Sequence, residues 1–196
     1  MFTGLVEQKG LIKSFTKNTD GFLMTISHDH SFNVEINDSV SCSGVCLTVI
    51  EKTLETFTVQ LVNETMQRTN ASDWNEGNLL NLERALLPST RMGGHFVQGH
   101  IDGLVKVLNI QFFDKSSTWT FEMTSNINKY IVEKGSIAIN GVSLTIAKKN
   151  EKSFEVAMIP HTIEMTSFCE IKIGDNVNIE VDILGKYIEN FVNGKK

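Results

Sequence analysis

Short segments of alternating apolar and polar residues follow one another along the whole chain at intervals of about ten residues. Alternation of this kind, interrupted by Gly, Asn and Asp, is typical of half-buried β-strands. In the first half we expect strands over residues 2–12, 21–27, 38–50, 56–63 and 78–84, with a short helical turn over 63–69. Because 38–50 holds both strands of a hairpin, the total is six strands, which predicts a small antiparallel barrel.

The hairpin at Ser39–Val49 recurs at Ser136–Ile146, and five of its eleven residues are identical in the two copies. Gly44 and Gly141 mark the turn, where glycine can adopt a positive φ. At a spacing of 97 residues, 13 of the 45 positions between 39 and 83 are identical, and near the N-terminus the spacing is 95. A repeat of this length indicates a duplicated domain.

The expected fold is therefore all-β, with two tandem six-stranded antiparallel Greek-key-like barrels followed by a C-terminal α-helix. The first barrel is expected over residues 1–86 and the second over residues 95–183, joined by a linker that contains Pro88. The second copy is also expected to contain an extra helix over residues 127–133.

Residues 184–196 follow both barrels and have the period of a helix. Their apolar positions form one stripe at i, i+3, i+4, i+7 and i+8, namely Leu184, Tyr187, Ile188, Phe191 and Val192. A helix this short is only marginally stable by itself. We therefore expect the stripe to dock on a partner chain and the segment to be an oligomerisation helix.

Composition excludes several classes of function. The net charge is −5 and no basic run is present, so nucleic acid is not expected as a partner. No apolar run approaches the ~18 residues of a membrane helix, and the first residues lack the basic and apolar regions of a signal peptide. Three cysteines without framework spacing fit a reducing compartment, so we expect a cytoplasmic protein that does not bind a membrane.

The residues alone give few signs of strong catalytic groups. No Ser-His-Asp set or phosphate-binding loop is evident, and the His-x-His pair at 28–30 lacks a third ligand, so no metal site is expected. Cys46 and His100 correspond to Ser143 and Leu5 in the other copy, so the two copies differ chemically at these positions. Taken alone, Cys46 fits a small buried apolar residue and His100 a core histidine.

Four motifs stand out in chain order: Met1–Glu7 (MFTGLVE), Gly44–Thr48 (GVCLT), Gly93–His100 (GGHFVQGH) and Gly141–Thr145 (GVSLT). In this order and spacing the sequence closely resembles riboflavin synthases of the alpha-chain type. The resemblance covers nearly the whole chain. It implies two similar barrels, a homotrimer formed through the C-terminal helices, and catalysis without a metal or organic cofactor.

The family's reaction converts two molecules of 6,7-dimethyl-8-ribityllumazine into riboflavin and 5-amino-6-(ribitylamino)pyrimidinedione by transfer of a four-carbon unit. The resemblance implies that each barrel binds one lumazine, and that the first barrel of one chain meets the second barrel of a neighbour. It leaves association with a lumazine synthase open. Because holding two reactants together can contribute ~7–11 kcal/mol, such a site needs few strongly reactive side chains.

The residues that match the family's functional positions form two groups. Those expected at the reaction centre are Phe2, Ser39, Cys46, His100, Asn140 and Ser143. The expected substrate-binding residues are Gly4, Leu5, Val6, Cys46, Leu47, Thr48, Gln60, Leu61, Val62, Asn63, Glu64, Thr65, Gly99, His100, Ile101, Lys134, Ser143, Leu144, Thr145, Ala157, Met158, Ile159, Pro160, His161 and Thr162. Backbone amides and threonine hydroxyls there could bind the pyrimidinedione edge and the ribityl chain.

We expect His100 to shuttle a proton from a lumazine methyl group. Cys46, or a water that it positions, is expected to assist addition at the adjacent ring carbon.

Asn140 departs from the family, in which this position is often Asp. An amide keeps the hydrogen-bonding shape but cannot act as a base, so a mechanism that needs a carboxylate at this position does not apply to this chain. Outside the matched positions, His95 is expected to hold the linker, and Cys42 and Cys169 are expected to be packing residues.

Three alternative functions fit parts of this pattern. A non-catalytic lumazine- or flavin-binding protein of the antenna type shares both barrels, but the resemblance suggests that it usually lacks the first-repeat Cys or the intact Gly93–His100 motif, and both are present here. A flavin-reductase barrel would carry an Arg-x-Tyr-Ser/Thr motif, which neither Tyr130 nor Tyr187 provides. A barrel that binds single-stranded nucleic acid is disfavoured by the acidic net charge.

Overall fold

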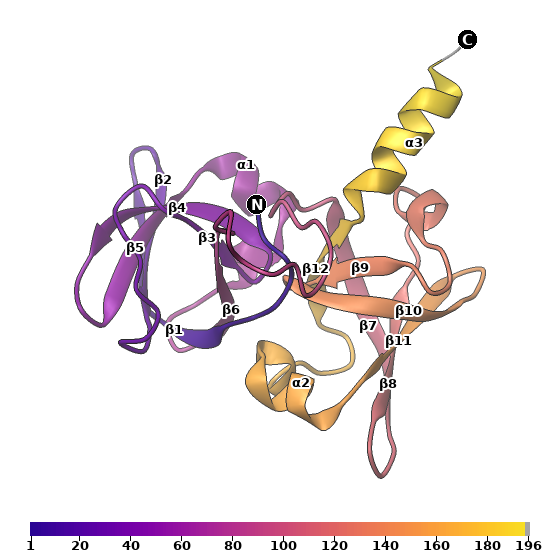
Figure 1. The fold of residues 1–196 in the computed structure, drawn as a ribbon. Helices are drawn as coiled ribbons and strands as arrows, with labels where there is room; N and C mark the ends of the chain where they lie inside the picture. Colours follow the sequence, from indigo (N-terminus) through magenta and orange to yellow (C-terminus); the bar gives the residue numbers. More distant parts are fainter. Residues whose placement is uncertain (195–196) are drawn as a thin grey trace.

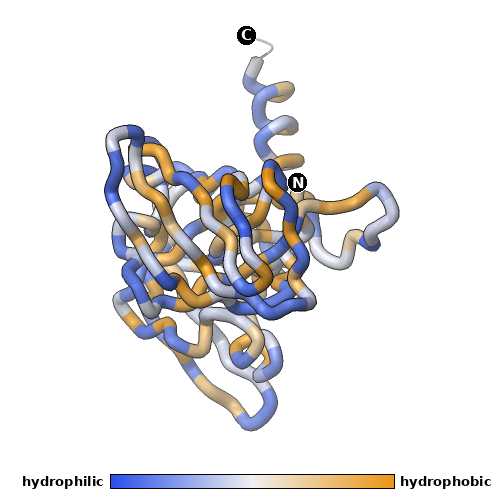
Figure 2. The backbone as a smooth tube through the Cα atoms, turned by 90° about the vertical axis from the view of Figure 1, so that its left-hand side faces the viewer, coloured by the Kyte–Doolittle hydropathy of each residue, from blue (hydrophilic) through white to orange (hydrophobic). Residues whose placement is uncertain are grey.

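The computed structural model describes residues 1–194 and contains two closed six-stranded antiparallel barrels followed by a helix (Figure 1). This confirms the fold class predicted from the repeat. Apolar and polar residues alternate along the strands, as Figure 2 shows. Within residues 1–194, no helix combines the length and the apolar character needed to cross a bilayer.

The first barrel has the strand order β1-β2-β5-β4-β3-β6 and closes where β6 pairs with β1. Its strands are β1 Gln8–Asn18, β2 Gly21–Ser27, β3 Ser39–Cys42, β4 Val45–Lys52, β5 Thr56–Leu61 and β6 Leu79–Arg84. The short helix α1 Asn63–Arg68 and the 3-10 turn η1 Asn70–Asp73 connect β5 to β6. The predicted hairpin, the helical turn and the strands after it are confirmed.

The second barrel repeats this order as β7-β8-β11-β10-β9-β12. Its strands are β7 Gly103–Phe112, β8 Ser117–Glu122, β9 Ser136–Ile139, β10 Val142–Lys149, β11 Ser153–Met158 and β12 Asn176–Val181. The helix α2 Pro160–Met165 and the 3-10 turn η3 Ser167–Cys169 occupy the places of α1 and η1. The topology is therefore duplicated along with the sequence.

Three local predictions were wrong. The strand expected over residues 2–12 begins only at Gln8, because Gly4 has a φ of +78° and breaks the extended run. The helix expected over 127–133 is a single 3-10 turn, η2 Asn128–Tyr130. Cys169, expected to be a packing residue, is exposed at the end of η3. Cys42 is buried in the first core as predicted, and burial raises the pKa of its thiol.

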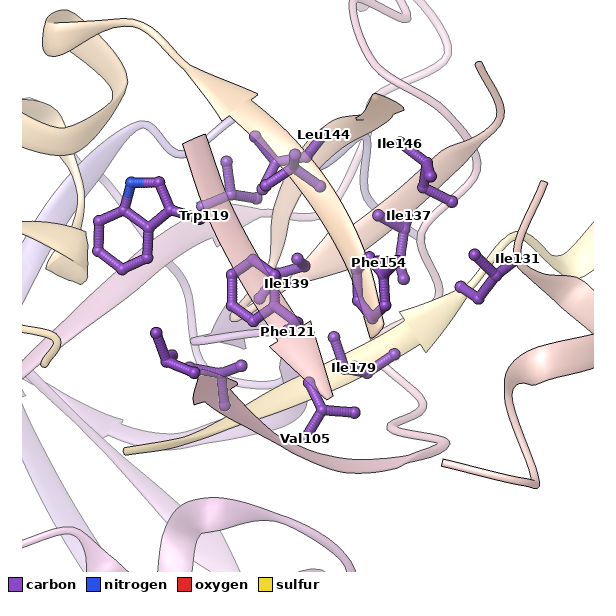
Figure 3. Packing of buried hydrophobic residues seen from close by; sticks show 14 of the residues in the cluster. Val105, Trp119, Phe121, Ile131, Ile137, Ile139, Leu144, Ile146, Phe154 and Ile179 are labelled. Atoms are coloured by element: carbon purple, nitrogen blue, oxygen red, sulfur yellow. The ribbon is translucent and has the colours of Figure 1, made fainter. Parts of the chain in front are cut away.

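Each barrel has its own hydrophobic core, built from the inward positions of its strands. In β8, Ser117, Trp119 and Phe121 are buried and alternate with more exposed residues, as expected for a strand with one face on a core. Figure 3 shows Trp119 and Phe121 among the branched aliphatic residues of the second core. The indole N–H of Trp119 donates to Ser117 Oγ at 2.8 Å, so no buried donor is left unpaired there.

The two barrels meet around an approximate two-fold axis on which repeat-equivalent residues contact each other. Phe2 and Val97 form an isolated antiparallel bridge, and a Cβ on Gly44 would lie 2.8 Å from the Gly141 nitrogen. Two equivalent asparagine amides also reach across the axis: Asn81 Nδ2 donates to the Asn140 carbonyl at 2.8 Å, and Asn178 Nδ2 donates to the Ser43 carbonyl at 2.9 Å. The duplication therefore extends to the contacts between the barrels.

Helix α3, Ile183–Asn193, extends away from the second barrel (Figure 1). Asp182 caps it by accepting a hydrogen bond from the Leu184 N–H at 3.0 Å. One side of α3 contacts its own barrel through the ion pairs Lys186–Asp102 and Lys129–Glu189. The predicted apolar stripe is 54–71% exposed and consists of Leu184, Tyr187, Ile188, Phe191 and Val192. Of the segment predicted as 184–196, residues 195–196 lie outside the described residues.

Candidate functional site

Each barrel carries one candidate binding surface, and each surface is completed by a segment from the other half of the chain. The first-barrel surface consists of Cys46–Thr48 on β4, Gln60–Thr65 at the end of β5 and start of α1, and Gly99–Ile101. The second-barrel surface consists of Ser143–Thr145 on β10, Ala157–Thr162 at the end of β11 and start of α2, and Gly4–Val6. These six segments contain every predicted binding residue except Lys134.

We call Gly4–Val6 and Gly99–Ile101 the end segments. Each of them completes the barrel of the other half of the chain, and two equivalent hydrogen bonds show this exchange. The Cys46 N–H donates to the Gly99 carbonyl at 3.0 Å, and the Ser143 N–H donates to the Gly4 carbonyl at 2.8 Å. Ile101 accordingly packs on the first core, and Val6 packs on the second. The repeat boundaries place residues 4–6 in the first barrel by sequence, but their contacts complete the second.

Two glycines allow the end segments to approach this closely. Gly4 has a φ of +78°, and a Cβ on it would lie 2.6 Å from the Cβ of Ser143. Gly99 has a φ of +81°, and a Cβ on it would lie 2.5 Å from the Cβ of Cys46. Both the backbone conformation and the short approach exclude a side chain at these positions.

Two buried carboxylates hold the end segments in place. Glu83 accepts hydrogen bonds from the Thr3 N–H and hydroxyl, both at 2.7 Å, and from the Gly4 N–H at 2.9 Å. Glu180 accepts three backbone hydrogen bonds in the same way, from Gln98 at 2.6 Å, Gly99 at 2.8 Å and His100 at 3.0 Å. Burial raises the pKa of both carboxyls, and these hydrogen bonds oppose the rise. Sequence reasoning did not assign Glu83 and Glu180 a function, although their identity in the repeat was a signal.

The exposed side chains on the two surfaces are similar in kind. Thr48 and Thr145 are exposed next to the buried Leu47 and Leu144, and the equivalent residues Val62 and Ile159 are 51% and 57% exposed. Exposed aliphatic groups beside hydroxyls and backbone amides suit a flat heterocycle with a polar edge. The two surfaces can therefore accommodate ligands of the same kind.

The surfaces differ at their centres. In the first, Cys46 is half-buried beside the Phe2–Val97–Ala138 cluster, and His100 is exposed on the adjoining segment. In the second, Leu5 is exposed in the place of His100, and Ser143 Oγ lies 2.7 Å from Nδ1 of His95. His95 is thus a candidate site residue that sequence reasoning assigned to the linker.

Three residues predicted at the reaction centre lie outside the six segments that form these surfaces. Phe2 is completely buried and packs beneath Cys46. Asn140 is buried in the β9–β10 turn with a φ of +45°, and its Oδ1 accepts from the Asn178 N–H at 2.8 Å. Ser39 pairs with Thr48 of the first-barrel surface and lines a groove of about 500 Å³ that Leu5 of the second-barrel surface also lines. The geometry gives the first two structural contacts, so their catalytic roles stay predictions.

Lys134 lies at the turn before β9, where it is exposed and has a φ of +67°. Its N–H donates to the Ile146 carbonyl at 2.8 Å, and the equivalent Asn37 N–H donates to Val49 at 2.9 Å. Its predicted contact with a ligand stays a prediction. Within residues 1–194, no cluster of three His, Cys, Asp or Glu side chains has the arrangement of a metal site.

Comparison with known proteins follows the same division of the chain. The family model described as "Lumazine binding domain" matches twice, at residues 3–85 and 98–182. The chain is also 40% identical to the riboflavin synthase of Bacillus subtilis over 193 residues, which cover 98% of this chain and 90% of that protein. The chain belongs to the riboflavin synthase family. This confirms the resemblance found in the four motifs.

Other family members are similarly close. The riboflavin synthase of Schizosaccharomyces pombe is 40% identical over 195 residues, covering 98% of this chain and 94% of that protein. That of Photobacterium phosphoreum is 37% identical over 194 residues, covering 98% and 89%. Among solved structures, LumP complexed with riboflavin matches with a TM-score of 0.85 over 92% of this chain and 99% of that one, at 23% identity. That likeness concerns the fold.

Proposed function

We propose that the chain acts as a riboflavin synthase that converts two molecules of 6,7-dimethyl-8-ribityllumazine into riboflavin and 5-amino-6-(ribitylamino)pyrimidinedione. The observation that carries this proposal is the pair of equivalent surfaces, each closed by a segment of the opposite half. Two such surfaces suit a reaction in which two copies of one molecule take different roles. LumP has been solved with this lumazine and with riboflavin, which supports ligands of this class on the shared fold.

The two surfaces would bind one lumazine each. Backbone amides of the end segments and the hydroxyls of Thr48 and Thr145 would bind the polar edge and the ribityl chain. Val62 and Ile159 would cover the ring face. Holding both rings together can contribute ~7–11 kcal/mol through entropy that is lost before the reaction. This source of catalysis is consistent with surfaces that carry few charged groups.

His100 and Cys46 are the proposed reactive groups of the first-barrel surface. His100 is exposed next to Gly99, whose carbonyl accepts from the Cys46 N–H, so the two side chains belong to neighbouring segments. His100 would take a proton from a lumazine methyl group, and Cys46 would assist addition to the adjacent ring carbon. His100→Gln and Cys46→Ser should each lower turnover at least tenfold, and turnover near that of the unmodified protein would remove these roles.

The working site is proposed to form between chains. The exposed stripe on α3 supports a homotrimer, in which the first-barrel surface of one chain would face the second-barrel surface of a neighbour. A cytoplasmic location and association with a lumazine synthase are further expectations of the family. Both stay predictions here.

A turnover assay separates this function from non-catalytic binding. The protein is incubated with 6,7-dimethyl-8-ribityllumazine, and both products are quantified by chromatography. A synthase yields riboflavin and the pyrimidinedione in equal amounts, with two lumazines consumed for each riboflavin. An antenna-type protein would retain lumazine without forming riboflavin, and that result would overturn the proposal.

A further inference from the structure

The buried His95 and the half-buried Ser143 form a hydrogen-bonded pair that is not repeated at Cys46 in the first barrel. His95 is 8% exposed, and its Nδ1 lies 2.7 Å from Ser143 Oγ. Ser143 itself corresponds to Cys46, which packs against the apolar Phe2 cluster instead of an imidazole. The pair is therefore a built-in difference between the two surfaces.

The backbone delivers the imidazole to Ser143 with little freedom. The His95 N–H donates to the Thr3 carbonyl at 3.1 Å, and Thr3 is in turn held by Glu83. A Cβ on Gly94 would lie 2.0 Å from the Thr3 oxygen and 2.9 Å from the Ser143 Cβ. Only glycine fits at position 94, so the chain passes directly over Ser143 before the imidazole turns toward it.

The surroundings of His95 indicate which atom donates in the His95 Nδ1–Ser143 Oγ hydrogen bond. Burial lowers the pKa of His95, opposed by the charge of Asp182, so the imidazole is neutral near pH 7. Its Nε2 is buried without a partner among residues 1–194. A proton on Nε2 would be a buried N–H without an acceptor, which costs a desolvation penalty, so we assign the proton to Nδ1. Nδ1–H then donates to Ser143 Oγ, and the serine hydroxyl is free to donate elsewhere.

We propose that His95 is a positioning residue that occupies the acceptor side of Ser143, so that the Ser143 hydroxyl donates to a carbonyl oxygen or ring nitrogen of the lumazine on the second-barrel surface. This inference rests on the proposed function. A donor aimed at the heterocycle stabilises negative charge that develops on it. Cys46 offers only a weak S–H donor at the equivalent place. The second barrel is then the one that stabilises an anionic form of its lumazine.

Four variants test this: His95→Asn, His95→Leu, Ser143→Ala, and His95→Leu combined with Ser143→Ala. An Asn side chain can place an N–H where Nδ1–H lies, whereas Leu cannot. Each variant is assayed for riboflavin formation, for lumazine affinity by fluorescence titration, and for thermal stability. The measurement of affinity does not depend on turnover, so the inference can be tested even if the unmodified protein forms no riboflavin.

We expect His95→Leu and Ser143→Ala each to lower kcat at least tenfold, and the double variant to lose no more than either alone, because both remove one hydrogen bond. His95→Asn should retain kcat within about threefold of the unmodified protein, the size of change that follows when a hydrogen bond is kept. Lumazine affinity at one of two sites should fall in the Leu and Ala variants only.

Three results would overturn the inference. His95→Leu could turn over and bind lumazine like the unmodified protein. The losses in the double variant could be the product of the single losses, which would mean that the two residues act independently. His95→Asn could lose as much turnover as His95→Leu while melting at the temperature of the unmodified protein, which would mean that the donated hydrogen bond is not what matters.

Discussion

Phe2 and Val97 form an antiparallel bridge with each other, although they occupy equivalent places in the two copies of the repeat. The Phe2 N–H donates to the Val97 carbonyl at 2.7 Å, and the Val97 N–H donates back at 3.1 Å. Each copy begins with one residue of this bridge. The residues after Phe2 therefore run towards the second barrel, and those after Val97 run towards the first. The exchange of Gly4–Val6 and Gly99–Ile101 follows from that geometry.

Because the end segments are exchanged, a substitution of Glu83 or Glu180 should weaken ligand binding at the barrel to which the substituted residue does not belong. Glu83→Gln places an amide NH₂ against backbone N–H donors and loosens residues 3–5, of which Gly4 and Leu5 belong to the second-barrel surface. We expect a loss of about 1–3 kcal/mol in the free energy of unfolding, as for unsatisfied buried donors. Ligand titration with site-resolved NMR should show weaker binding at the second barrel, although Glu83 lies on β6 of the first.

Glu180→Gln is the matched control for that experiment. It loosens residues 98–100 and should weaken the first-barrel site instead. If each substitution weakened the site of its own barrel, the exchanged segments would not be the parts that bind ligand.

Gly4→Ala should abolish turnover, because the added Cβ meets Ser143 at 2.6 Å. The control is Gly77→Ala, since Gly77 also has a positive φ, of +88°, but open space where an added Cβ would lie. We expect the control to lose only ~1–2 kcal/mol from the left-handed conformation and to keep its activity. Urea denaturation and riboflavin formation measure the two effects, and equal activity in both variants would contradict the packing argument.

Phe191→Asp should dissociate the proposed trimer, because it places a charge on the exposed stripe of α3. Light scattering after size exclusion should show monomers, and turnover should fall at least tenfold if the working site lies between chains. Leu54→Asp is the control, at an 81% exposed position on the first barrel away from α3. A Phe191→Asp monomer with full turnover would place both reacting lumazines on one chain.

Stability should fall in acid partly through His95. Burial lowers its pKa below the ordinary 6.5, with the Asp182 charge acting against this. Below pH 6.5 the unfolded chain therefore binds a proton that the folded chain does not, and stability declines at up to about 1.4 kcal/mol per pH unit. His95→Asn lacks this term, so its unfolding free energy should change less between about pH 7.5 and 5.5. Identical pH dependence in both proteins would refute a buried neutral His95.

Most strands could be predicted because the information is local. Alternation in β2, β5 and β8 reports the inward and outward faces of a strand directly, and Gly44 and Gly141 mark a turn through their backbone freedom. The strand predicted over residues 2–12 was wrong for the opposite reason. Its first residues pair with Val97 and β10, and nothing in their own pattern reports partners so distant in sequence.

The candidate site likewise has features that follow from the sequence and features that only the tertiary structure shows. The sequence itself determined which segments of the two copies are equivalent, that Cys46 in one copy corresponds to Ser143 in the other as a chemical difference, and that Glu83 and Glu180 are equivalent. Only the tertiary structure decided which barrel each end segment completes and that His95 contacts Ser143. A repeat spacing relates equivalent positions in the two copies, whereas these contacts join non-equivalent positions across the axis, so the spacing does not reveal them.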